Sequence, residues 1–371
     1  MMRRLRMAMI GGGPGSFIGP IHRIAAELDR EIELVAGAFS SDAERSREAG
    51  MAYRIDPERA YPDVGAMVAG ERGRTDGADF VAIVSPNYHH LPAARVALAA
   101  GLPVLSDKPL TATLTEAREL ADLVADAGVA FGVTYTYSGY PLVREARDRV
   151  ARGDIGNVRK VVVEYPQGWL AGAAEGKQAE WRVDPARAGE GGCIGDIGTH
   201  AFHLAEYVSG QRVTRLLADL EAVVPGRRLD DDVAVLLRFD NGARGVLLAS
   251  QIEVGELNGL RIRIYGDKGA LIWRQEEPNS LTIHRIDGSS ELVRAGTTIG
   301  DAAARASRTP GGHPEGYLEG FANIYRDFAR QLRGDPGTEV PGIGDGLRGM
   351  AFVSAAVAAS RDGRGWTDFQ I

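Results

Sequence analysis

The chain has 371 residues, 44% of them hydrophobic and 25% charged, and a formal net charge of −7 at pH 7. This length allows two domains and a core large enough to need no disulfide or metal for stability. The negative charge argues against nucleic acid as a partner, because phosphate binding requires clustered lysine and arginine. The single cysteine, Cys193, excludes an intramolecular disulfide, and no segment approaches the ~18 apolar residues of a membrane span. We therefore expect a cytoplasmic protein that binds neither nucleic acid nor membrane.

In the first 135 residues, short apolar runs alternate with segments of helical periodicity. Strands that alternate with helices predict a parallel sheet with helices on both faces. The run 80–84 is apolar without alternation, as expected of a strand buried on both sides. The predicted strands are 7–10, 32–37, 80–84, 103–105 and 129–133, and the predicted helices are 21–29, 42–49, 91–100 and 115–127.

After residue 135 the pattern changes to runs with two-residue alternation, separated by turn residues, which predict a large, mostly antiparallel open sheet. The sequence thus predicts an α/β protein with a doubly wound domain over 1–135 and an α+β domain over 136–371, whose final helices could pack on the first domain. The elements expected in chain order are a helix at 142–152, a strand at 158–165, a glycine-rich loop to Gly195, a helix at 196–209, strands at 213–223, 232–239, 243–250, 259–265, 270–273 and 281–285, a loop at 296–314, and helices at 315–333 and 345–359.

A glycine-rich segment joins the first predicted strand to the first predicted helix. Backbone without side chains lets a dinucleotide pyrophosphate approach the N–H groups and the positive end of a helix. Gly11 and Gly13 fit the usual G-x-G-x-x-G spacing, whereas the next matching glycine, Gly19, comes three residues late. The alternative is a tight turn with a purely structural role. The expected cofactor contacts are Gly11, Gly13, Pro14, Gly15, Ser16, Phe17, Ile18 and Gly19.

The end of the second predicted strand bears on the choice between NAD and NADP. An NAD enzyme usually places Asp or Glu there to hold the ribose hydroxyls. This chain has Ser40 and Ser41, followed by Asp42 and Arg45. Serine with arginine would accommodate a 2′-phosphate and Asp42 would oppose it, while capping of the next helix is an equally open interpretation. NAD is the expected cofactor, and NADP is the alternative.

Two further segments carry residues suited to hydride transfer at a hydroxyl. Lys108 follows the strand 103–105, at the sheet edge where ligands of such folds bind, and could stabilise negative charge on a reacting oxygen. Asp196 and His200 are four residues apart on one face of a predicted helix, where the histidine could take up the hydroxyl proton. The alternatives are a solvated lysine, a helix cap and a core histidine.

A metal site is a further possibility, because Asp196, His200 and His203 stand at positions i, i+4 and i+7 of the predicted helix. We expect no metal, since Lys108 nearby would repel a cation.

The ordered motifs resemble the glucose–fructose oxidoreductase/inositol dehydrogenase/MocA family over nearly the whole chain. The matches are Ile18-Gly19-Pro20-Ile21-His22, Ser85-Pro86-Asn87-Tyr88-His89-His90, Asp107-Lys108-Pro109, Trp181-Arg182 and Asp196-Ile197-Gly198-Thr199-His200. The resemblance implies an N-terminal Rossmann domain and a C-terminal domain with an open sheet. It also implies that Lys108, Asp196 and His200 are catalytic and that the cofactor site includes Ser85, Pro86, Asn87, His90, Lys108 and Pro109.

The chain departs from the family pattern in three places. Asp107 stands where members commonly have Glu, the glycine loop is longer, and residues 135–137 lack the arginines of many inositol dehydrogenases. The loops at 167–169 and 311–317 look like those of a sugar-acting subgroup. Because aromatic faces pack on sugar C–H groups and Arg or His binds hydroxyls, the expected substrate contacts are Lys108, Tyr137, Trp169, Arg182, Asp196, His200 and His313, with His203 as a further candidate.

These features predict an NAD(P)-dependent dehydrogenase or reductase that acts on a ring hydroxyl carbon of a sugar, glycoside or inositol-like polyol. One alternative is an NAD-dependent enzyme that cleaves glycosides through transient oxidation at C3, and another is a non-catalytic dinucleotide sensor. The alternating strands leave one sheet face in need of cover, so we expect a homodimer or homotetramer formed through that face.

Overall fold

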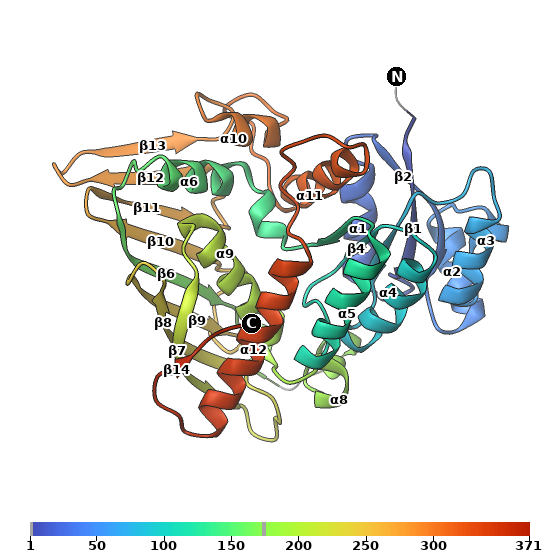
Figure 1. The fold of residues 1–371 in the computed structure, drawn as a ribbon, viewed down its shortest axis with the longest axis horizontal. Helices are drawn as coiled ribbons and strands as arrows, with labels where there is room; N and C mark the ends of the chain where they lie inside the picture. Colours follow the sequence, from blue (N-terminus) through green and yellow to red (C-terminus); the bar gives the residue numbers. More distant parts are fainter. Residues whose placement is uncertain (1–2, 173–175) are drawn as a thin grey trace. The chain divides into compact units, whose positions relative to one another are not determined.

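The computed structural model describes residues 3–172 and 176–371. The chain divides into two compact units, each with its own sheet (Figure 1). The first unit comprises Met1–Thr134 and Phe321–Leu347, and the second comprises Tyr135–Gly320 and Arg348–Ile371. No helix in the described part of the chain is long and apolar enough to cross a membrane.

The first unit contains a five-stranded parallel sheet in the order β2-β1-β3-β4-β5, which confirms the predicted doubly wound sheet. The strand order reverses between β1 and β3, so the loops that follow these two strands meet at the point where such sheets bind ligands. The elements are β1 (Leu5–Gly11), α1 (Ile18–Glu27), β2 (Ile32–Ala38), α2 (Ala43–Ala52), η1 (Pro57–Arg59), α3 (Val64–Arg72), β3 (Phe80–Val84), η2 (Asn87–His89), α4 (His90–Ala99), β4 (Val104–Ser106), α5 (Leu114–Ala127) and β5 (Phe131–Val133).

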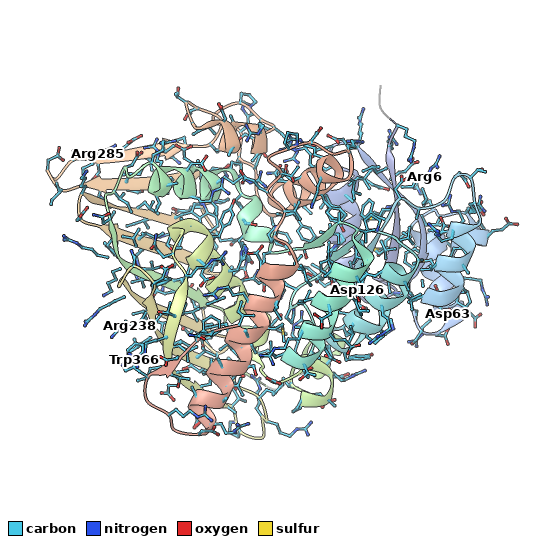
Figure 2. The ribbon with its side chains drawn as sticks, viewed as in Figure 1. Arg6, Asp63, Asp126, Arg238, Arg285 and Trp366 are labelled. Atoms are coloured by element: carbon cyan, nitrogen blue, oxygen red, sulfur yellow. The ribbon has the colours of Figure 1, made fainter. Side chains whose placement is uncertain are left out.

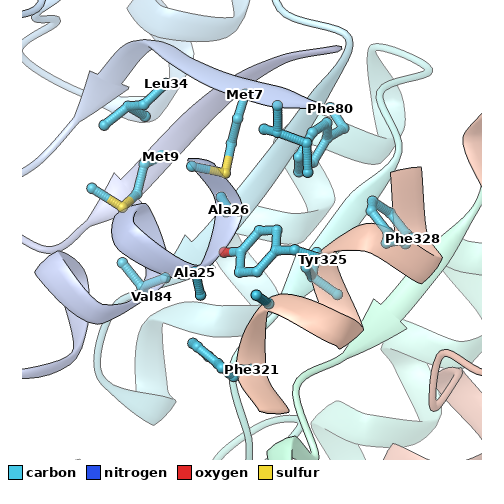
Figure 3. Close-up of a cluster of buried hydrophobic side chains, with 14 of the residues drawn as sticks. Met7, Met9, Ala25, Ala26, Leu34, Phe80, Val84, Phe321, Tyr325 and Phe328 are labelled. Atoms are coloured by element: carbon cyan, nitrogen blue, oxygen red, sulfur yellow. The ribbon is translucent and has the colours of Figure 1, made fainter. Parts of the chain in front are cut away.

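The core of the first unit includes side chains from near the end of the chain. Helix α11 (Tyr317–Leu332) contributes Phe321, Tyr325 and Phe328 to the cluster that contains Met7 of β1 and Phe80 of β3 (Figure 3). The rings of Phe80 and Phe328 meet edge to face with centroids 5.4 Å apart. Such a pair adds about 1 kcal/mol beyond the burial of its area. Residues 321–332 are therefore an integral part of this unit.

The second unit contains a nine-stranded sheet in the order β13-β12-β11-β10-β6-β9-β8-β7-β14. All neighbouring strands are antiparallel except β6 and β9, so the predicted, mostly antiparallel sheet is confirmed. Its strands are β6 (Val158–Pro166), β7 (Val213–Glu221), β8 (Asp232–Phe239), β9 (Arg244–Ser250), β10 (Arg261–Gly266), β11 (Gly269–Arg274), β12 (Ser280–Arg285), β13 (Ser290–Arg294) and β14 (Thr367–Asp368). Its other elements are η3 (Thr136–Gly139), α6 (Pro141–Ala151), α7 (Lys177–Arg182), α8 (Pro185–Ala188), η4 (Ile194–Gly198), α9 (Thr199–Ser209) and α10 (Asp301–Ala306). Helix α12 (Ile343–Arg361) has residues in both units.

The two faces of this sheet differ. Helices α6 and α9 pack on one face, against β11 and β12 and against β6 and β9 respectively (Figure 1). The opposite face, here called the open face, exposes 42% of Leu236, 36% of Leu248 and 36% of Tyr265. Near the β14 edge, the guanidinium of Arg238 lies 3.9 Å from the ring centre of Trp366 (Figure 2). The open face thus presents apolar side chains from the central strands.

Several predicted boundaries were wrong. Helix α3 was not predicted, because Gly65 and Gly70 weaken its helical pattern; Asp63 starts it by accepting a 2.8 Å bond from Ala66 N. The short helix α10 lies within the predicted loop 296–314, and α7 and α8 lie within the predicted glycine-rich loop. The expected helix 196–209 begins as the π-helical turn η4 and continues as α9.

Candidate active site

The glycine turn joins β1 to α1 in the first unit. Ser16 N donates to Gly13 O at 3.0 Å, and Ser16 Oγ accepts from Gly19 N at 3.1 Å. Phe17, at the N-cap of α1, makes no side-chain capping bond, and the first turn of the helix has no acidic residue. The positive end of α1 is therefore not neutralised by its own side chains and suits an anion.

Close backbone packing in this turn requires glycine at two positions. A Cβ atom on Gly13 would lie 2.5 Å from Phe39 O, and one on Gly19 would lie 2.4 Å from Gly12 Cα. Gly12, which sequence reasoning did not select, thus forms the contact that explains the late Gly19. The tight turn and a helix start without an acidic side chain together fit the pyrophosphate of a dinucleotide.

The residues after β2 hold the start of α2. Asp42 is the N-cap of α2 and accepts a 2.9 Å bond from Arg45 N, while Ser40 Oγ accepts from Asp42 N at 3.2 Å. The side chains of Ser41 and Arg45 are exposed. Asp42 is thus engaged as a helix cap, which the sequence had left as an open interpretation.

The loop that carries Lys108 is fixed by a buried carboxylate. Asp107 Oδ1 accepts 2.8 Å bonds from Lys108 N and from Thr134 Oγ1, and Asp107 Oδ2 lies 3.8 Å from His22 Nε2. Burial alone would raise the pKa of Asp107, but His22, the Lys108 charge and the Thr134 hydrogen bond hold this pKa well below its usual range. His22 Nδ1 lies 2.7 Å from Tyr325 Oη. Asp107 is therefore an ionised anchor for the backbone of Lys108.

His90 connects two of the loops assigned to the cofactor. Its Nε2 lies 2.8 Å from Ser85 O, and its Nδ1 lies 2.9 Å from Pro109 O. The side chain is buried, as is Asn87, and the Lys108–Pro109 peptide bond is cis. Because both ring nitrogens face backbone oxygens of the chain, His90 positions these loops; a direct cofactor contact is not needed to explain its burial.

In the second unit, Asp196 lies in the π-helical turn η4 just before α9. Its Oδ2 accepts a 3.1 Å bond from Arg182 Nε and a 3.0 Å bond from Gln251 Nε2. The Arg182 guanidinium lies 5.9 Å from the ring centre of Trp169, which is 47% exposed. Three of the predicted substrate residues, Trp169, Arg182 and Asp196, are thus neighbours.

His200, one turn along the chain, lies among tyrosines. It is 7% exposed, and its ring centre lies 5.8 Å from that of Tyr135, 4.9 Å from that of Tyr137 and 6.3 Å from that of Tyr165. The hydroxyls of Tyr137 and Tyr165 hydrogen-bond to each other, and Asn258 Oδ1 accepts a 2.7 Å bond from Tyr165 Oη. Burial raises the pKa of both tyrosines, so their hydroxyls remain neutral and can donate as well as accept.

Two further candidates, His203 and His313, have different surroundings. The ring of His203 stacks on Tyr135 with centroids 4.2 Å apart, as a packed core histidine does, and His313 is exposed with Nδ1 3.3 Å from Pro310 O. Within residues 3–172 and 176–371, no group of three His, Cys, Asp or Glu side chains could hold a metal ion. Sequence reasoning missed Tyr165, Gln251 and Asn258, which come from distant strands and loops.

The parallel sheet and its glycine turn define the chain as a dinucleotide-binding protein. Residues 5–135 match the oxidoreductase family with an NAD-binding Rossmann fold, and residues 143–272 match the GFO/IDH/MocA C-terminal domain. The chain belongs to the GFO/IDH/MocA family, as the sequence motifs predicted, and it is an NAD-dependent oxidoreductase.

Similar proteins cover the whole chain. An uncharacterized oxidoreductase of Bacillus subtilis, YfiI, is 35% identical over 99% of this chain and 97% of its own. The levoglucosan dehydrogenase of Pseudarthrobacter phenanthrenivorans is 26% identical over 99% of this chain and 98% of its own. Two solved structures of an inositol dehydrogenase homolog from Azotobacter vinelandii, one with NAD+ and one with NADH and myo-inositol, have TM-scores of 0.96 and 0.94 and identities of 35% and 34%, and each covers 100% of this chain and 98% of its own.

Proposed function

We propose that this enzyme transfers a hydride between nicotinamide and a ring hydroxyl carbon of a sugar or an inositol-like polyol. The relatives named levoglucosan dehydrogenase and inositol dehydrogenase homolog support a cyclic substrate with several hydroxyls. The observation that carries the proposal is the surroundings of His200. Three tyrosines line it, with neutral hydroxyls on Tyr137 and Tyr165, and the Asp196 carboxylate is held one turn away.

In the proposed mechanism, Lys108, Asp196 and His200 serve the same substrate hydroxyl. His200 takes the hydroxyl proton, and the Lys108 ammonium stabilises the negative charge that develops on the oxygen. Asp196, held by Arg182 and Gln251, orients the imidazole. NAD, when bound, would accept the hydride that leaves the same carbon, and in the reductive direction His200 returns the proton.

The glycine turn holds the pyrophosphate in this proposal, and the Asp107 carboxylate keeps the backbone of Lys108 in place. Trp169 and Arg182 contribute an aromatic face and hydrogen-bond donors to the substrate, and Tyr137 contributes its hydroxyl. We also propose that the enzyme works in the cytoplasm, because a chain with the single cysteine Cys193 suits a reducing compartment.

A substrate panel tests this function. Purified enzyme is mixed with sugars, glycosides and inositols, each with NAD and with NADP, and formation of the reduced cofactor is followed by absorbance. We expect stoichiometric NADH with at least one cyclic polyol and slower turnover with NADP. Glycoside hydrolysis without NADH would select the redox-neutral alternative, and cofactor binding without any turnover would select the sensor.

We also propose that the enzyme is a homodimer or homotetramer formed through the open face. Leu236 and Leu248 lie on the central strands β8 and β9, and Leu248 lines a groove together with Val162, Val246 and Tyr265 and the charged side chains of Lys160, Glu164 and Arg263. Contiguous exposed apolar side chains on a sheet face favour burial against a second copy, which a two-fold axis can repeat on both subunits.

Light scattering at micromolar concentration should therefore give at least twice the mass of one chain. Leu248→Arg should reduce this mass, because it places a charge in the proposed contact. Val254→Arg, at a residue 85% exposed in a loop, is the matched control and should leave it unchanged. A wild-type monomer would contradict the proposed assembly.

A further inference from the structure

Asp230 holds the beginning of the turn that carries Asp196. Its Oδ1 accepts a 2.7 Å bond from Gly192 N, its Oδ2 accepts a 2.7 Å bond from Ile194 N, and its backbone oxygen accepts a 2.8 Å bond from Cys193 N. Asp230 thus accepts hydrogen bonds from three consecutive backbone N–H groups. A Cβ atom on Gly192 would lie 2.4 Å from Asp230 O, so the turn has no room to move closer.

The same segment also supports the second contact of Asp196. Gln251 N donates to Asp231 O at 2.9 Å, and the Gln251 side chain donates to Asp196 Oδ2 at 3.0 Å. The turn itself continues through the bond from Asp196 N to Gly192 O at 2.9 Å and then into α9, which carries His200. The backbone before β8 therefore fixes both the turn that carries Asp196 and the residue Gln251, whose side-chain amide binds the Asp196 carboxylate.

We propose that Asp230 is a positioning residue that sets the place of Asp196 and His200 for hydride transfer. The inference rests on the proposed function, because it assigns Asp230 to the same reaction. In this proposal Asp230 does not contact the substrate. It acts through its hydrogen bonds to the turn at 192–194. A shift of about 1 Å in a catalytic group can lower turnover by about a hundredfold.

The raised pKa of Asp230 indicates that the ionised carboxylate is not there to stabilise the fold. Although the residue as a whole is only partly buried, enclosure of its carboxyl group raises the pKa of Asp230 to about 6. An acid whose pKa is raised by folding is destabilising in its ionised form. At neutral pH the isosteric Asp230→Asn variant should therefore fold, while one of the two N–H groups of the turn loses its acceptor.

Asp240, which follows the other end of β8, provides a matched control. Its Oδ1 accepts bonds from Arg212 N at 3.2 Å and from Asn241 N at 2.9 Å, so it also anchors two backbone N–H groups, but not those of the catalytic turn. Asp240→Asn makes the same change of side chain away from Asp196 and Gln251. Loss of stability alone should affect both variants, whereas loss of positioning should affect only Asp230→Asn.

The experiment measures kcat and KM for the best substrate of the panel, and the Kd for NAD by fluorescence titration, in wild type and both variants. We expect Asp230→Asn to lower kcat tenfold to a hundredfold with an unchanged Kd for NAD, and Asp240→Asn to keep kcat within about twofold. If Asp230→Asn does not fold, Gly192→Ala displaces the same contact and should give the same loss.

Equal kcat in wild type and Asp230→Asn, or an equal loss in Asp240→Asn, would overturn the inference. Turnover of the wild type in the same series tests the proposed function separately, because inactivity of the wild type on every cyclic polyol would reject that function before any variant is compared.

Discussion

Replacing Lys108 with methionine is expected to lower kcat about a thousandfold while leaving the Kd for NAD within a few-fold of the wild-type value. Methionine has nearly the same length as the lysine stem but no charge, so it removes the stabilisation of the developing oxyanion, and single groups of this kind contribute about 10² to 10³ in kcat. The backbone of residue 108 keeps its bond to Asp107, which preserves the loop. Steady-state kinetics on the best panel substrate and fluorescence titration with NAD measure the two quantities.

Lys268→Met is the matched control for this substitution. Lys268 is exposed beside Gly269, at the turn between β10 and β11, so the same change of charge there should leave kcat unchanged. A Lys108→Met enzyme with at least half of the wild-type kcat would remove Lys108 from the proposed mechanism. A loss confined to NAD binding would instead assign the lysine to the cofactor.

The sequence predicts the parallel sheet of the first unit well because its strands are marked by burial. The run 80–84 is apolar at every position, and all five residues are buried as β3. Helix α3 escapes prediction for the opposite reason. Its buried side chains, Met67, Val68 and Glu71, are few and include a charged residue that is paired with Arg59. Local periodicity therefore finds elements with a continuous apolar face and misses those held by specific polar contacts.

The residues of the candidate site also differ in whether local sequence spacing reveals them. Asp196 and His200 are visible in the sequence because their spacing of four places them on one helical face. Gln251, which holds Asp196, comes just after β9, and its position follows from the pairing of β9 with β6 and β8. Strand order in a nine-stranded sheet depends on packing across the whole unit, so no local spacing reveals which distant amide reaches a given carboxylate.

His22 shows that a residue can be found in a sequence motif although its role is not visible in the sequence. The sequence places His22 at the end of the first motif match, but its buried contacts with Tyr325 and Asp107 join residues more than 80 positions apart. The contact with Tyr325 depends on α11 packing in the core of the first unit, which involves the last sixth of the chain, whereas the contact with Asp107 depends on the loop after β4. Candidate catalytic and binding residues can thus be selected from the sequence, whereas the residues that contact them become known only from the fold.

Replacing His200 with asparagine should have an effect as large as that of Lys108→Met, because it removes the proposed proton acceptor. Acid–base groups contribute about 10² to 10⁴ in rate, so we expect kcat to fall about a thousandfold with little change in the Kd for NAD. Asparagine keeps a polar group among Tyr135, Tyr137 and Tyr165 and leaves less empty space than alanine. His284→Asn, at an exposed position on β12, is the matched control and should retain wild-type kcat.

The double variant Lys108→Met/His200→Asn then tests whether the two side chains serve one hydroxyl. Groups that act together in one transition state have strongly non-additive effects, whereas independent effects multiply. We expect the double variant to be about as slow as the slower single variant, near a thousandfold below wild type. A loss close to a millionfold would show that Lys108 and His200 contribute independently, and the proposed joint action of these two side chains on one hydroxyl would have to be abandoned.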